Sequence, residues 1–91
     1  MASKAQRKQV RIEARCDIEQ RSFPIAISDI TPAGCLCEAD VDWGEDFDFL
    51  HLKIADAVDI NGKLLWHDGH RAEITFFGRI HPVVIDRWMR G

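Results

Sequence analysis

The sequence has no tyrosine, three cysteines and three prolines, and it lacks any apolar run near the ~20 residues that span a bilayer. The missing apolar run excludes a membrane-spanning helix, and a charged fraction of 30% supports that exclusion. The first ten residues are basic and polar with no apolar stretch behind them, which argues against a signal peptide. We therefore expect a cytoplasmic protein that does not act on membranes.

The cysteines are few and unsuitably spaced for a disulfide framework. Cys16, Cys35 and Cys37 are an odd number, and none forms a Cys-x-x-Cys motif, so reduced thiols in a cytosolic core fit better. Cys35 and Cys37 would share one face of a strand. With His67 and His70 they could form a metal site, but zinc ligand pairs usually lie closer together in sequence, so we favour small core residues and expect no cofactor.

The net charge of −3 hides a strong segregation of charge along the chain. The first fifteen residues hold five basic side chains against one acid, whereas residues 38–59 hold eight acids against one lysine. A cationic arm on an acidic body suggests that the arm holds a specific anion, such as a phosphate ligand. A general nucleic-acid binder would be basic over more of its surface. The alternative is a solvated N-terminus without a ligand.

Strand periodicity dominates the rest of the chain, which is long enough for one small domain. Alternating or apolar runs predict six strands, over residues 10–18, 23–27, 35–39, 47–54, 58–66 and 72–76. The apolar register shifts within 47–54, which usually marks a bulge or a bend. Asp68-Gly69 is a hairpin signal, and Asn61-Gly62 is either a second hairpin or part of a strand.

The C-terminal segment has the spacing of a helix. Ile80, Val83, Val84, Arg87 and Trp88 form a helical stripe, and Pro82 would occupy the first turn. Six short strands and one closing helix predict an all-β fold, a small six-stranded antiparallel β-barrel with a C-terminal α-helix. We expect residues 1–9 to form a flexible basic arm and residues 10–91 to form the barrel domain.

The tryptophans and the missing motifs bear on function. Trp66 and Trp88 continue apolar faces and are expected in the core, whereas Trp43 is either an exposed partner contact or packs over the barrel mouth. No glycine-rich phosphate loop, serine-histidine-aspartate spacing or zinc-protease motif is present, so we do not expect an enzyme. Cys16 lies on an apolar face and is expected to be an inert thiol.

Two motifs resemble the paired signatures of the PilZ family. Arg7 to Arg11 reads Arg-x-x-x-Arg, and Asp29 to Gly34 reads Asp-x-Thr-x-x-Gly, with Thr31 in place of the usual serine. Residues 62–76 resemble the Gly-x-Val-x-Trp strand of the family with its turn and the next strand, and residues 81–88 resemble its C-terminal helix. The resemblance covers most of the chain, and it implies that Asn61-Gly62 lies within the fifth strand.

The resemblance implies a receptor or adaptor for cyclic di-GMP in bacterial second-messenger signalling. Arginine can form two parallel hydrogen bonds with a phosphate or with the edge of a guanine. An aspartate can accept a hydrogen bond from a guanine amino group. The hydroxyl of Thr31 can either hydrogen-bond the ligand or cap the turn. The implied ligand-binding residues are Arg7, Arg11, Asp29, Thr31 and Gly34, with Lys4 and Lys8 as further cations of the arm.

Two alternatives stay open at this point. Matching the start of the first strand to the usual PilZ pattern makes Arg7 the second arginine, with Lys4 near the place of the first and Arg11 inside the strand. In that register the chain could be a degenerate adaptor that binds no nucleotide and acts through protein contacts. In either case we expect an effector protein as partner, and a monomer or weak dimer. Glu73 also stands where family members often have glycine.

Overall fold

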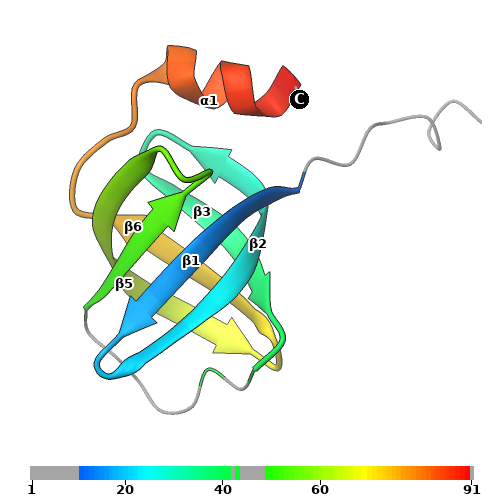
Figure 1. Ribbon diagram of the computed structural model, residues 1–91, viewed down its shortest axis with the longest axis vertical. Helices are drawn as coiled ribbons and strands as arrows, with labels where there is room; N and C mark the ends of the chain where they lie inside the picture. The colour runs from blue at the N-terminus through cyan, green and yellow to red at the C-terminus, as the bar shows by residue number, and fades with distance from the viewer. Residues whose placement is uncertain (1–10, 42, 44–48, 91) are drawn as a thin grey trace, which may run out of the picture.

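The computed structural model describes residues 11–41, 43 and 49–90 of the chain. Its strands close into an antiparallel barrel in the lateral order β1-β2-β3-β6-β5-β4, and one helix follows them. The elements are β1 (Ile12–Ile18), β2 (Arg21–Thr31), β3 (Gly34–Ala39), β4 (Leu50–Ile54), β5 (Val58–Asp68), β6 (Arg71–Phe76) and α1 (Pro82–Arg90). Figure 1 shows α1 lying across one end of the barrel, so the predicted all-β barrel with a C-terminal helix is confirmed.

Alternation of apolar and polar residues sets which side chains fill the barrel. Along β1, Ile12, Cys16 and Ile18 are buried, while Glu13 and Arg15 between them face solvent. The same alternation runs through β3 and β6, so the interior of the barrel is apolar. Each large aliphatic side chain that is fully buried there stabilises the fold by about 1.5–3 kcal/mol relative to an exposed one.

Two short turns join strands at one end of the barrel. The β1–β2 turn occupies residues 19–20, and the β5–β6 turn has Gly69 at φ +65°, which confirms the predicted Asp68-Gly69 hairpin. Asn61-Gly62 does not form a hairpin. Gly62 lies inside β5 and pairs with Leu50 on one side and Phe76 on the other, as the family resemblance implied.

The irregularities of the sheet lie in other strands than the one in which the sequence predicted a bulge or bend. The described part of the predicted 47–54 strand, β4, pairs with β1 and β5 without any register shift, so the expected bulge is absent from residues 50–54. Residues 47 and 48 lie outside the described residues. The register instead shifts at Ser28 in β2 and at Leu65 in β5, and both shifts affect the candidate site described below.

Trp43 is part of the core rather than an exposed contact. Its side chain is fully buried, its ring meets Phe23 edge-on with centroids 5.3 Å apart, and its indole N–H donates to the carbonyl oxygen of His70 over 2.9 Å. His70 belongs to the β5–β6 turn, so Trp43 packs at the end of the barrel that carries this turn. Of the two roles that the sequence left open, packing is the one observed.

The helix covers the other end with a slightly different face from the one predicted. Ile80 and Ile85 are buried and Val84 and Trp88 are half-buried against the core, whereas Val83 is exposed. The apolar stripe is therefore shifted from the predicted one, and Trp88 is only partly in the core. No helix in the described part of the chain is long and apolar enough to cross a bilayer.

Candidate functional site

The turn between β2 and β3 is built around the hydroxyl of Thr31. This hydroxyl accepts from the backbone N–H groups of Ala33 and Gly34, each over 3.2 Å, and lies 3.4 Å from the Gly34 carbonyl oxygen, to which it donates. These bonds use the hydrogen-bonding capacity of the hydroxyl locally. Of the two roles considered for Thr31, the structure shows the cap of the turn.

The same turn is tied to the segment that leads into the helix. The N–H of Phe76 donates to the Ala33 carbonyl oxygen over 2.7 Å, and the N–H of Ile80 donates to that of Pro32 over 3.0 Å. Gly34 permits this close approach, because a Cβ there would lie 2.5 Å from the backbone oxygen of Ile74. The turn therefore has a fixed position against β6 and the start of α1.

Two bulges reset which side chains face outward beside this turn. In β2 the ladder to β3 skips Ser28, so both Ser28 and Asp29 face solvent. In β5 the ladder to β6 skips Leu65, so Leu65 and Trp66 both face outward. Trp66 is 41% exposed, and its predicted place in the core is wrong because the bulge reverses the alternation after Leu64.

The sheet register places four outward-facing residues in one row across β2, β3, β6 and β5. Asp29 pairs with Leu36, Leu36 with Glu73, and Glu73 with Trp66. With neighbouring strands about 4.8 Å apart, the row spans roughly 14 Å. The Trp66 indole N–H donates to Glu73 Oε1 over 2.6 Å. This row and the Thr31–Gly34 turn line a groove of about 410 Å³.

The described residues that line the groove give it an acidic character. Asp29 and Glu73 supply two carboxylates, and no lysine or arginine among the described residues lines it. Arg11 is not among the residues that line it; it precedes β1, whose first residue, Ile12, pairs with Ile27 of β2. The other cations of the expected site, Lys4, Arg7 and Lys8, lie outside the described residues.

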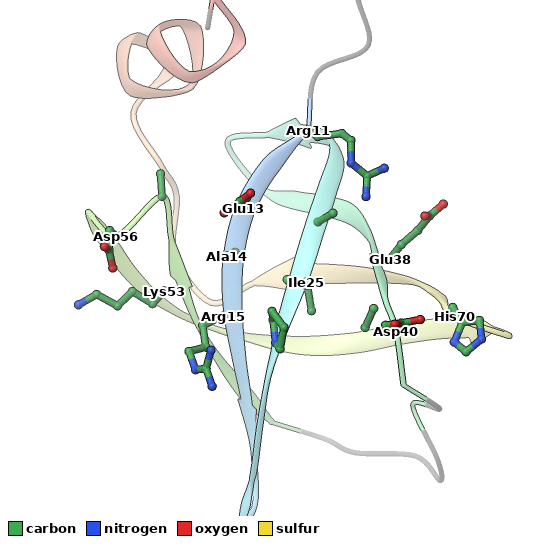
Figure 2. Close-up of a pocket in the computed structure, with 14 residues that line it drawn as sticks. Arg11, Glu13, Ala14, Arg15, Ile25, Glu38, Asp40, Lys53, Asp56 and His70 are labelled. Atoms are coloured by element: carbon green, nitrogen blue, oxygen red, sulfur yellow. The ribbon is translucent and has the colours of Figure 1, made fainter.

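Arg11 lines a larger groove, of about 1120 Å³, over the outer faces of β1, β2 and neighbouring strands. Figure 2 shows the Arg11 side chain extending outward from the end of β1. Basic and acidic side chains alternate along this groove, with Arg11, Arg15 and Lys53 among Glu13, Glu38, Asp40 and Asp56. Because neither sign prevails in its described lining, this groove does not concentrate the positive potential that an anionic ligand needs.

The three cysteines are buried inside the barrel and do not form a metal site. No group of three histidine, cysteine or acidic side chains within residues 11–41, 43 and 49–90 has the geometry to hold a metal ion. Burial raises the pKa of the Cys16 thiol to about 12, with smaller contributions from Cys37 and Asp17. A hydrogen bond with Cys35, together with burial, raises the pKa of Cys37 as well.

We expect these thiols to be inert in the folded protein. A disulfide reagent added at pH 8 should label none of the three cysteines in native protein, and all three in denaturant, because the thiolate is the reactive form. Since Cys16 keeps its proton above the pKa of 9.0 of an unperturbed thiol, stability should also fall as the pH rises beyond about 9. Rapid labelling of the native protein would contradict this expectation.

Sequence reasoning identified half of this site. The structure places Asp29, Thr31 and Gly34 in the lining of one groove, whereas Arg11 lines the other. Leu36 and Trp66 were missed as groove residues, because their place depends on the pairing of distant strands and on the Leu65 bulge. Comparison of the chain with protein-family models, curated proteins and solved structures gives no match.

Proposed function

We propose that this protein is a cyclic di-GMP receptor that binds its ligand between the groove and the basic N-terminal arm. The observation that carries the proposal is the open groove beside the β2–β3 turn, which Asp29, Gly34 and Trp66 line together. The resemblance of residues 7–11 and 29–34 to the PilZ signatures supports it independently. No catalytic role is proposed for these residues.

The charges of the described residues suggest which groups of the ligand the groove would bind and which the N-terminal arm would bind. Cyclic di-GMP carries two phosphates and two guanines, and a phosphate is held by cations rather than carboxylates. The groove offers Asp29 as an acceptor for guanine N–H groups and the exposed indole of Trp66 as an apolar surface for a base. The phosphates would therefore be bound by the arm, through Arg7 and its neighbouring lysines.

With this division, ordering of the arm on the ligand would be the switch. A segment that orders only when it wraps a ligand creates a surface that did not exist before, and a partner protein can read that surface. The β2–β3 turn is already fixed by the Phe76 and Ile80 hydrogen bonds, so it would serve as the rigid half of the site.

Titration with cyclic di-GMP by calorimetry tests this function. The wild-type protein should bind with a micromolar or tighter Kd, and Arg7→Ala should weaken binding about tenfold or more, the usual loss for charge-assisted hydrogen bonds. Arg90→Ala is the matched control, because Arg90 is exposed on α1 and paired with Asp86. No heat from the wild-type protein at high ligand concentration would refute the receptor function.

The same titration separates the two arginine registers. If the Arg7–Arg11 motif binds as written, Arg11→Ala should weaken binding as Arg7→Ala does. If Arg7 is the second arginine, Lys4→Ala should weaken binding and Arg11→Ala should not. A short single-stranded oligonucleotide serves as a control in low and moderate salt, because non-specific strand binding falls steeply with salt concentration.

An adaptor without a nucleotide ligand is the second candidate, and one observation favours it. Phe49 and Phe77 are 69% and 52% exposed, and their rings lie 5.6 Å apart between centroids. Exposed aromatic side chains in contact with each other are typical of protein-binding surfaces. A wild-type protein that gives no heat with cyclic di-GMP would leave this candidate in place.

A further inference from the structure

The Glu73–Trp66 pair closes the far end of the groove and has no counterpart in the two sequence motifs. Glu73 is half-buried and pairs with Leu36 and Trp66 on its two sides. Its Oε1 atom accepts the Trp66 indole N–H over 2.6 Å, which fixes the carboxylate in place. Among the described residues nothing else bonds to its second oxygen, which is left as an acceptor at the groove, beside an indole whose only donor is already engaged.

A fixed carboxylate at this place distinguishes purine bases by their hydrogen-bonding edges. Guanine presents adjacent N–H donors at N1 and N2, which a carboxylate accepts, whereas adenine presents one amino donor at N6 beside a lone pair at N1 that a carboxylate repels. Partial burial strengthens both the attraction and the repulsion. Asp29 lies two strands away, roughly 10 Å across the sheet, so it is too distant to contact the same base edge.

We infer that Glu73 is a specificity-determining residue that selects guanine over adenine in the bound dinucleotide, with Trp66 held beside it as the apolar surface of the same subsite. This inference rests on the proposed function, and it assigns a new residue to the site. It also accounts for an acidic side chain in the proposed groove of an anionic ligand, because the carboxylate would meet a base rather than a phosphate.

The test compares cyclic di-GMP with cyclic di-AMP in the wild-type protein and in Glu73→Gln. Glutamine keeps an oxygen that can accept the Trp66 N–H, but it replaces the second acceptor by a donor that suits adenine N1. The wild-type protein should prefer cyclic di-GMP, and Glu73→Gln should reduce the ratio of the two affinities by about tenfold or more. Glu38→Gln is the matched control, because Glu38 is an exposed acid on β3 that lines the other groove.

The outcomes distinguish this inference from the function on which it rests. A wild-type protein that binds neither dinucleotide overturns both. A wild-type protein that binds the two equally, or a Glu73→Gln variant that keeps the full preference for cyclic di-GMP, overturns the role of Glu73 and leaves the receptor function standing. An unchanged thermal midpoint and unchanged tryptophan fluorescence in Glu73→Gln would show that a lost preference is not a folding defect.

Discussion

Gly34→Ala is expected to lower the free energy of unfolding by about 3 kcal/mol, a large share of the roughly 5–15 kcal/mol of a small domain. The added Cβ would lie 2.5 Å from the Ile74 oxygen and 3.3 Å from the Thr75 Cα, and both atoms belong to the backbone of β6. A strand cannot move aside as a side chain does, so β3 and β6 must separate locally. Urea denaturation followed by circular dichroism measures the loss.

Gly78→Ala is the matched control for this effect. A Cβ at Gly78 would meet only the Ile60 Cδ1 atom, at the ordinary contact distance of 3.8 Å, so the variant should unfold close to the wild-type midpoint. If Gly34→Ala were as stable as Gly78→Ala, the close packing of β3 on β6 would be wrong. Loss of ligand binding in Gly34→Ala with retained stability would instead place Gly34 in contact with the ligand.

Trp43→Ala should be still more damaging, with an expected loss of about 3–5 kcal/mol. The substitution removes a fully buried ring, its edge-on contact with Phe23 and the hydrogen bond to the His70 carbonyl. The resulting cavity would lie between Phe23 of β2 and the β5–β6 turn, and a cavity that the surrounding side chains fill only partly adds to the loss. A fall in the midpoint of thermal unfolding, followed by circular dichroism, measures this effect.

Trp66→Ala tests whether burial, rather than the removal of any tryptophan, causes that loss. Trp66 is 41% exposed, and within the described part of the chain its side chain hydrogen-bonds only to the partly exposed Glu73, so its replacement should cost about 1 kcal/mol or less. Equal losses for the two variants would show that Trp43 is not buried in solution. The pair of variants therefore separates the structural tryptophan from the one in the groove.

The barrel could be predicted because its signals are local. Apolar alternation along each strand predicted which residues of β1, β3 and β6 face inward, and Gly69 marked a hairpin by its freedom at positive φ. The bulges could not be predicted in the same way. Strict alternation from Val58 to Trp66 predicted an inward Trp66, and nothing in the local pattern indicated the extra residue at Leu65 that turns Trp66 outward.

The residues of the β2–β3 turn could be identified as candidate site residues from the sequence, whereas the other residues that line the groove could not. Thr31 and Gly34 are three residues apart, so a single short motif contains them. Leu36, Glu73 and Trp66 come together only through the pairing of β3, β6 and β5, which residues far apart in the sequence determine. The acidity of the groove is thus a property of the sheet register that a reading of separate motifs misses.

Closure of the barrel restricts how any partner can recognise this protein. Each strand from β1 to β6 is hydrogen-bonded to a described neighbour on both sides over at least part of its length, so no strand of the described barrel is an edge strand along its whole length. Addition of a full strand by a partner, which many small β domains use, therefore has no complete edge to pair with in the described residues. The effector of the proposed function would instead bind through side chains on the outer surface, and single substitutions there should change the choice of partner without disturbing the fold.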